Sequence, residues 1–198
     1  LANLLVHNCE KFYNVGMHNH IGVKGADWNN GLDMAKEKGE SVAFSAMYSH
    51  NLALLSSMLA TSGRPKVKVS AELLLLLRRV KYDDARAKQR LLRTYYSRVQ
   101  PCVSGRKIEI DTAALISNLS IKSKWILQHI RKKEWLREGF FNGYYDNKSR
   151  RVEGVGSKGV RMMLASQVFP VMSGVAEERH IRSIIRSVKK YLYDKKLG

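Results

Sequence analysis

Residues 25–33 read Gly25-Ala26-Asp27-Trp28-Asn29-Asn30-Gly31-Leu32-Asp33, and Gly39-Glu40-Ser41 follows six residues later. A tryptophan, acidic residues and two amides thus lie between glycines. This composition is typical of a loop that binds a sugar, because the indole face can stack on a ring while polar neighbours hydrogen-bond hydroxyl groups. An ordinary turn is the other interpretation, because Asn, Asp and Gly favour turns for backbone reasons alone.

The same residues resemble a known signature. The Asp-Trp-Asn-Asn-Gly and Gly-Glu-Ser segments are similar to the Asp-Trp-Asn-Asp-Gly … Gly-Glu-Ser motif of the cellobiose and chitobiose phosphorylase family, inverting enzymes related to modules of cyclic β-1,2-glucan synthases. Two later segments also resemble that catalytic domain, in the same order along the chain: Phe141-Asn142-Gly143-Tyr144-Tyr145-Asp146-Asn147 and Ser166-Gln167-Val168-Phe169-Pro170-Val171-Met172-Ser173-Gly174.

The resemblance implies the transfer of a glycosyl unit from a β-linked disaccharide or oligosaccharide to inorganic phosphate. Phosphate is then a co-substrate, and neither a cofactor nor a metal is expected. In this reaction phosphate is the nucleophile, so the protein supplies one carboxylic acid that protonates the leaving oxygen, unlike a hydrolase with two carboxyl groups. The family has that aspartate where this chain has Asn30, and an amide cannot transfer the proton. We expect neither Asp27 nor Asp33 to replace it.

The resemblance also indicates substrate-binding residues, which are Asp27, Trp28, Asn29, Glu40, Tyr145 and Asp146. Each has a plainer interpretation. Asn30 can be a turn residue, Trp28 can belong to the core, and the Tyr144–Tyr145 pair can serve packing alone. Glu40 can either orient the loop or favour the start of the following helix. We expect Trp125 and Trp135, which lie in a helical stretch, to be core residues.

Apolar periodicity predicts a mainly α protein. The later helices of an (α/α)6 toroid, with a small β-hairpin insertion, agree with both the pattern and the resemblance. The long helices are predicted over residues 1–13, 40–59, 70–96, 161–172 and 177–193, and two short ones follow Asp111 and Ser120 as N-caps and end at Leu119 and Leu136. The predicted hairpin pairs residues 99–103 with 107–110, and residues 18–38 and 139–159 are predicted loops.

The whole chain, residues 1–198, is expected to be one piece of a catalytic (α/α) barrel domain, since both ends read as interruptions of a helical pattern. Helices 40–59 and 161–172 are apolar on more than one face. We therefore expect them to expose apolar surface and to need the remainder of the domain or self-association. No apolar run approaches the ~20 residues of a membrane span, and the first residues lack the pattern of a signal peptide.

Cysteine and histidine usage indicates a cytoplasmic protein without a metal site. Cys9 and Cys102 are isolated, which fits reduced thiols better than a disulfide framework. His18 and His20 are the one close histidine pair, and no third ligand lies at a suitable spacing.

The net charge is +18, from 35 Lys and Arg against 17 Asp and Glu. Such an excess is typical of proteins that bind polyanions. In the sequence the positive charge is spread over most predicted helices, without a lysine tail or an aromatic-interleaved stripe. We therefore do not expect a nucleic-acid partner. A non-catalytic carbohydrate-binding remnant and a basic helical nucleic-acid-binding protein are the two alternative functions.

Overall fold

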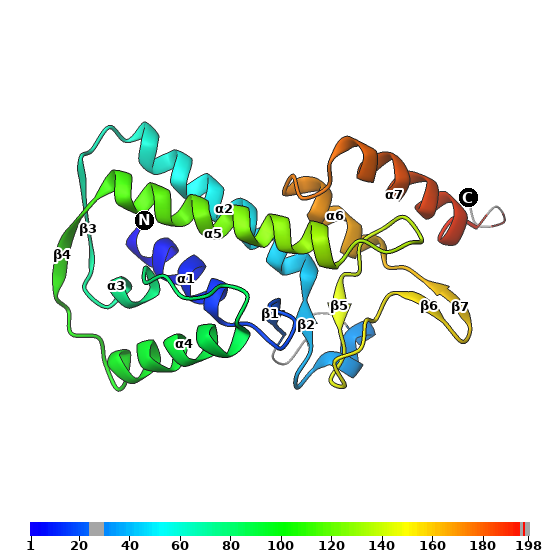
Figure 1. The fold of residues 1–198 in the computed structure, drawn as a ribbon, viewed down its shortest axis with the longest axis horizontal. Coiled ribbons are helices and arrows are strands. Elements are labelled where there is room, and N and C mark those ends of the chain that lie inside the picture. The colour runs from blue at the N-terminus through cyan, green and yellow to red at the C-terminus, as the bar shows by residue number, and fades with distance from the viewer. Residues whose placement is uncertain (24–29, 195, 197–198) are drawn as a thin grey trace. The chain divides into compact units, whose positions relative to one another are not determined.

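The computed structural model describes residues 1–23, 30–194 and 196. The fold is mainly α, as the periodicity predicts (Figure 1). The helices of the described chain are α1 (Ala2–Tyr13), α2 (Val42–Thr61), α3 (Leu73–Leu76), α4 (Ala85–Val99), α5 (Thr112–Lys133), α6 (Leu164–Met172), α7 (Glu178–Tyr191) and the 3-10 helix η1 (Asn30–Ala35). The strands are β1 (Ile21–Gly22), β2 (Glu40–Ser41), β3 (Lys66–Ser70), β4 (Lys107–Asp111), β5 (Tyr144–Tyr145), β6 (Gly154–Gly156) and β7 (Gly159–Arg161).

The chain divides into two compact units, each made of two segments. Unit 1 comprises Leu1–Ile21 and Tyr48–Trp125, and unit 2 comprises Gly22–Met47 and Ile126–Gly198. Helices α2 and α5 each contribute residues to both units.

Unit 1 contains α1, α3, α4 and the β3–β4 ribbon, together with parts of α2 and α5. Serine hydroxyl groups join α2 to α5. The Ser49 hydroxyl donates to the Ser123 carbonyl at 2.9 Å, and the Ser56 and Ser120 hydroxyls lie 2.9 Å apart. Ser120 therefore lies inside α5, where its hydroxyl group contacts α2. The prediction that it caps a second helix was wrong, because α5 is continuous from Thr112 to Lys133.

The single helix predicted over residues 70–96 was also wrong, because the chain leaves helical geometry between α3 and α4. Distant side chains bind the carbonyl groups that a continuous helix would use. The Asn118 amide donates to the Leu77 carbonyl at 2.7 Å, and the Tyr13 hydroxyl donates to the Arg78 carbonyl at 2.6 Å. A new helix then begins at Asp84, whose side chain accepts from the Ala87 N–H at 2.9 Å.

The predicted hairpin of residues 99–103 with 107–110 was wrong as well. Strand β4 pairs antiparallel with β3, with Lys66 opposite Asp111 and Ser70 opposite Lys107 (Figure 1). In β3 the side chains of Val67 and Val69 are buried while Lys66 and Lys68 are exposed. This alternation stabilises β3 as the partner strand, whereas residues 100–106 are exposed and have no apolar face to bury.

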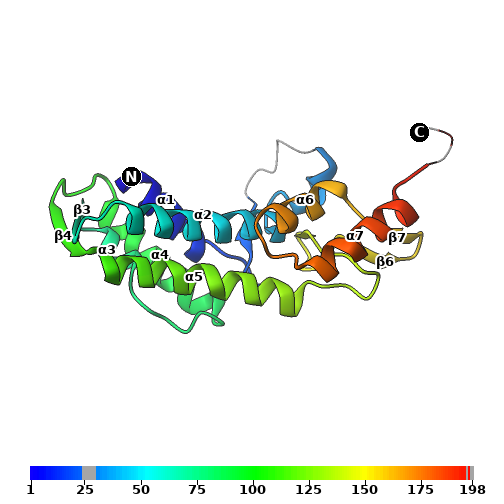
Figure 2. The ribbon, with the colours of Figure 1, turned by 90° about the horizontal axis from the view of Figure 1, so that it is seen from above.

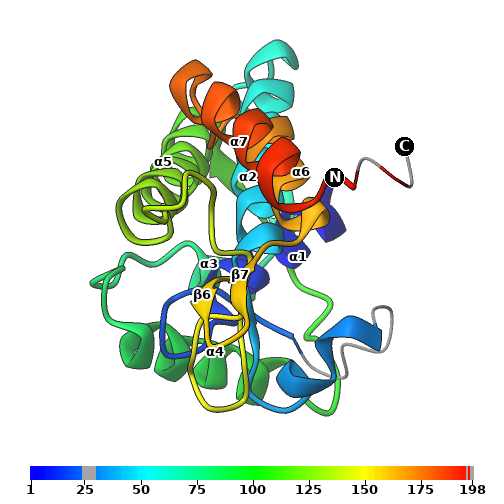
Figure 3. The same cartoon turned by 90° about the vertical axis from the view of Figure 1, so that its right-hand side faces the viewer.

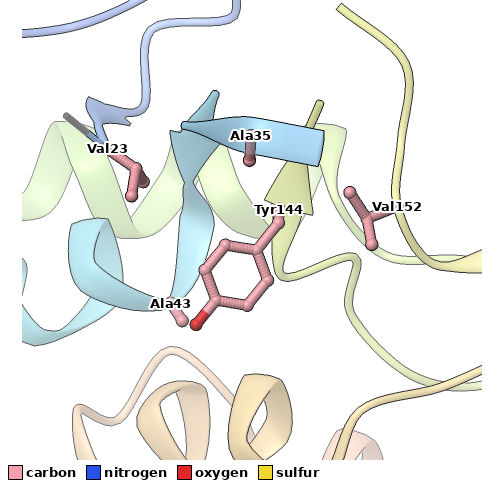
Figure 4. Packing of buried hydrophobic residues seen from close by; sticks show 5 residues of the cluster. All are labelled: Val23, Ala35, Ala43, Tyr144 and Val152. Atoms are coloured by element: carbon pink, nitrogen blue, oxygen red, sulfur yellow. The ribbon is translucent and has the colours of Figure 1, made fainter. Parts of the chain in front are cut away.

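Unit 2 is built on a small sheet with strand order β1–β2–β5. Helices α6 and α7 pack together (Figure 2), and β6 and β7 form a separate hairpin (Figure 3). A buried apolar cluster joins the sheet to its neighbours, and the ring of Tyr144 extends toward Ala43 of α2 (Figure 4). The other buried members are Val23, Ala35 and Val152. Tyr144 is therefore a core residue.

Helix α6 exposes apolar side chains along one face, as expected of residues 161–172. The exposed residues follow helical spacing: Leu164, Val168, Val171 and Met172. In α2, Leu54 and Met58 are exposed too. Among the described residues, no helix is both long enough and apolar enough to cross a membrane.

Two lysines are fully buried in unit 1. The Lys88 ammonium group lies 3.7 Å from the centre of the Trp125 ring and 4.1 Å from that of Phe12, and Nζ has no hydrogen-bond partner within the described chain. Burial lowers the pKa of Lys88 to about 6; Asp83 opposes this shift, and the charge of Lys122 adds to it. The aromatic faces favour the cation, but the loss of hydration outweighs them.

We predict that this buried amine makes stability depend on pH. The folded pKa lies below that of the unfolded chain, so the unfolded state binds more protons above pH 6. The free energy of unfolding should therefore rise by up to about 1.4 kcal/mol for each pH unit between pH 6 and 9. Lys88→Met should remove the contribution of Lys88 to this rise and should be most stabilising at pH 6. Above pH 8 a smaller rise should remain, because burial also lowers the pKa of Lys122 to about 8.

Chemical denaturation of both proteins across that pH range tests the prediction. Lys124→Met makes the same chemical change at an exposed position and is the control. A constant difference in unfolding free energy between the wild type and Lys88→Met from pH 6 to 9 would contradict a buried neutral amine.

Candidate functional site

The Gly-Glu-Ser segment and the Tyr-Tyr segment are neighbouring strands in unit 2. Strand β2 pairs antiparallel with β5, with Glu40 opposite Tyr145 and Ser41 opposite Tyr144. Two predicted site residues that are 105 positions apart therefore lie side by side. Both are buried, with exposed fractions of 2% for Glu40 and 5% for Tyr145.

Glu40 does not begin the following helix. It lies in β2, and the side chain of Ser41 accepts a hydrogen bond from the Phe44 N–H at 2.9 Å, which is the N-cap interaction of α2. The structure therefore assigns the start of the helix to Ser41. The predicted helix over 40–59 begins two residues later, at Val42.

The third resembling segment also reaches this sheet. Gln167 of α6 is buried, and its side-chain amide pairs with the backbone of Phe141 in both directions. Its Oε1 accepts from the Phe141 N–H at 2.9 Å, and its Nε2 donates to the Phe141 carbonyl at 2.7 Å. This double hydrogen bond fixes the chain three residues before β5.

Asn147 connects β5 to the segment that follows η1. Its Oδ1 accepts from the N–H groups of Glu37 and Lys38 at 3.0 and 2.9 Å, and its own N–H donates to the Met34 carbonyl at 2.8 Å. The chain that follows Asn30 is thereby attached to the Tyr144–Asn147 segment.

The structure does not describe most of the predicted sugar loop. Asp27, Trp28 and Asn29 lie outside the described residues. The backbone of Asn30 begins η1, and its side chain lies outside the description. Their predicted roles, including that of Asn30 at the general-acid position, stay predictions.

Tyr145 is held by a buried carboxylate that the sequence analysis missed. The Tyr145 hydroxyl donates to Glu134, with both carboxylate oxygens at 3.0 Å, and the Asn142 amide donates to Glu134 Oε2 at 3.1 Å. Arg151 lies 3.8 Å from the same carboxylate. Burial, followed by the charge of Glu134, raises the pKa of Tyr145 to about 12, so the hydroxyl keeps its proton. A lone glutamate within the basic run at residues 131–137 was the available sequence signal.

A second buried carboxylate, Glu153, supports the start of β5. It accepts hydrogen bonds from the N–H groups of Gly143 at 2.6 Å and Met163 at 2.8 Å. Burial raises the pKa of Glu153 to about 7, although these hydrogen bonds oppose the shift. A Cβ atom at Gly143 would lie 2.1 Å from Ser166 Oγ and 2.6 Å from Glu153 Oε2, so this close approach requires glycine.

Asp146 organises the turn after β5. Its Oδ1 accepts from the N–H groups of Lys148 and Arg150, and Oδ2 accepts from the Arg150 guanidinium at 2.9 Å. Burial raises the pKa of Asp146, but the hydrogen bonds from Arg150 and Lys148 outweigh it, and the net pKa lies below its usual value. These contacts give Asp146 a structural role, and its predicted contact with substrate stays a prediction.

A surface hollow of about 450 Å³ lies beside Glu153. Trp135, Arg137, Arg151 and Glu153 contribute to its lining. Trp135 was predicted to be a core residue, but it is half-buried; its ring contacts Phe141 and His180, with centroid separations of 4.8 and 4.5 Å. The hollow therefore offers an aromatic side chain, two guanidinium groups and the carboxyl groups of Glu138 and Glu153.

The described residues contain no group of three or more His, Cys, Asp or Glu side chains that could hold a metal ion. Cys9 is buried and Cys102 is exposed, and both are free thiols. Burial raises the pKa of Cys9 to about 11, so this thiol stays protonated at neutral pH.

No protein-family model matches this chain, and no curated protein matches it either.

We predict that Asn147→Ala loosens the segment after η1, because the Glu37 and Lys38 N–H groups lose their shared acceptor. The loss should cost about 1–2 kcal/mol of stability and should speed amide hydrogen exchange at both positions. Asn147→Asp keeps an acceptor oxygen and is the matched control. Unchanged exchange at Glu37 and Lys38 in the alanine variant would show that the contact does not hold this segment.

Proposed function

We propose that this chain is part of a glycoside phosphorylase-like catalytic domain of the (α/α)6 type and that it binds a β-linked disaccharide or oligosaccharide. The reaction of the family that the chain resembles is transfer of a glycosyl unit to inorganic phosphate. The chain itself binds without turnover, because Asn30 occupies the position of the general acid.

One observation carries the proposal. The segments that resemble the phosphorylase family are far apart in the sequence, yet in unit 2 they meet at one small sheet. Glu40 lies opposite Tyr145, Gln167 pairs with Phe141, and Asn147 binds the backbone after η1. This convergence supports the proposal, because a binding site requires its segments to lie close together.

The roles follow from the chemistry of the side chains. We assign Trp28 the stacking surface for the sugar ring, and Asp27 and Asn29 the hydrogen bonds to its hydroxyl groups. Glu40 and Tyr145 are buried, Tyr145 is oriented by Glu134, and we assign both residues the support of this loop. Without a proton donor at Asn30, the leaving oxygen must depart as an alkoxide, which removes a factor of about 10²–10⁴ in rate.

The apolar face of α6 supports a larger assembly. Leu164, Val168 and Met172 are exposed on one side of this helix. In a toroid such a face packs against a neighbouring helix. We assign it to the remainder of the domain or to a second copy of the chain.

Calorimetric titration with cellobiose, sophorose and chitobiose tests the binding half of the proposal. We predict that at least one of them binds and that Trp28→Ala weakens binding about tenfold or more, an effect of about 1.4 kcal/mol. Trp125→Phe, in unit 1, is the control for loss of an indole outside the candidate site. If none of the three sugars binds to the folded chain, the carbohydrate assignment is wrong.

An assay for sugar 1-phosphate tests the catalytic half. We predict no product from this chain or from its Asn30→Asp variant alone, because positioning phosphate and both sugar rings requires several loops. When each version is placed in a full-length relative, only the Asn30→Asp version should be active. Turnover by the unmodified chain would overturn the assignment of Asn30.

A further inference from the structure

A groove of about 400 Å³ in unit 1 lies where the chain passes from α3 to α4. Half-buried aliphatic side chains line it, namely Leu75, Val80 and Leu91. Three exposed arginines also line it, namely Arg78, Arg79 and Arg90. The groove therefore combines an apolar surface with a strong positive charge.

The positive charge of the groove is largely uncompensated. Within the described chain, Arg78 and Arg79 form no salt bridge, and Arg90 lies 3.7 Å from Asp84, whose other oxygen caps α4. Residues 78–107 hold ten Lys or Arg side chains against two acidic ones, Asp83 and Asp84. In the sequence the positive charge is spread over most predicted helices, and in the fold three of the arginines line one groove.

A neighbouring hollow extends this surface. It shares Leu75 with the groove and adds Arg98 and Arg106. Its one acidic side chain, Glu72, accepts a hydrogen bond from the Ser104 N–H at 2.9 Å. The two hollows together offer five guanidinium groups, so they suit a ligand with several anionic groups.

The lining determines which anion fits best. Guanidinium groups bind carboxylates through paired hydrogen bonds. Neither hollow has an aromatic residue in its lining, so neither offers a surface on which bases or sugar rings could stack. The aliphatic side chains give anchors for apolar residues, which a nucleic-acid backbone would leave unused.

We propose that this groove binds an acidic segment of a partner protein, in which aliphatic residues alternate with Glu or Asp. The aliphatic residues pack on Leu75, Val80 and Leu91, and the carboxylates pair with Arg78 and Arg79. This is the helix-in-groove mode of recognition with an electrostatic rim, in which the aliphatic residues of the segment recur every three or four positions and the acidic residues flank them. The groove belongs to unit 1, and the residues of the proposed carbohydrate site belong to unit 2.

Fluorescence anisotropy with labelled probes tests the proposal on the whole chain. The first probe is an amphipathic peptide of Glu, Leu and Ala. Two matched peptides replace every Glu by Gln or every Leu by Ser, and a short DNA duplex represents nucleic acid. The test variant is Arg78→Glu with Arg79→Glu. The control variant is Arg186→Glu with Lys189→Glu, which makes the same change in net charge at exposed positions of α7.

We expect the Glu/Leu peptide to bind, and both the Gln and the Ser peptides to bind about tenfold more weakly or worse. The test variant should lose about tenfold in affinity, while the control variant should stay within about twofold. If both variants lost affinity for the Glu/Leu peptide equally, net charge alone would explain the loss and the proposal would be wrong. Equal affinities for the Leu and Ser peptides would also overturn it. So would tighter binding of the DNA duplex that is lost in the Arg78→Glu, Arg79→Glu variant.

Discussion

The pairing of β2 with β5 is the constraint on which unit 2 depends. It joins Glu40 and Ser41 to Tyr144 and Tyr145 across more than one hundred residues of chain. Two-residue strands are too short to be stable by themselves, so their surroundings must hold them. The core around Tyr144 supplies apolar packing, and the side chains of Gln167 and Asn147 fasten the backbone on either side.

Buried carboxylates complete this support at a cost in hydration. Glu134 and Glu153 are almost fully buried. Glu134 accepts hydrogen bonds from Tyr145 and Asn142, and Glu153 accepts them from the N–H groups of Gly143 and Met163. A buried charge is tolerated when hydrogen bonds replace the lost water. Removal of either carboxylate would leave N–H or O–H donors unsatisfied in the interior. The two glutamates therefore specify the position of the Tyr-Tyr segment more than they add to net stability.

Unit 1 contains two fully buried amino groups. Lys88 lies between aromatic rings without a hydrogen-bond partner, and Lys122 donates to Asn118 on the same helix. Nearby, the Asn118 amide and the Tyr13 hydroxyl bind the carbonyls that end α3. These contacts end the helical conformation between α3 and α4, where the arginine-lined groove lies. A continuous amphipathic helix would instead have kept those carbonyls in its own backbone hydrogen bonds.

The sequence by itself determined the mainly α class and the helices that follow strong apolar periodicity, among them α1, α2, α6 and α7, because those patterns are local. It also singled out the segments that converge in unit 2. Only the tertiary structure decided that β3, rather than residues 99–103, pairs with β4, and that α3 and α4 are separate. It alone brought Glu134 and Glu153 to β5. The physical reason is that strand partners, captured carbonyls and buried carboxylates are chosen by residues distant in the chain, such as Asn118 and Tyr13, which no local pattern can indicate.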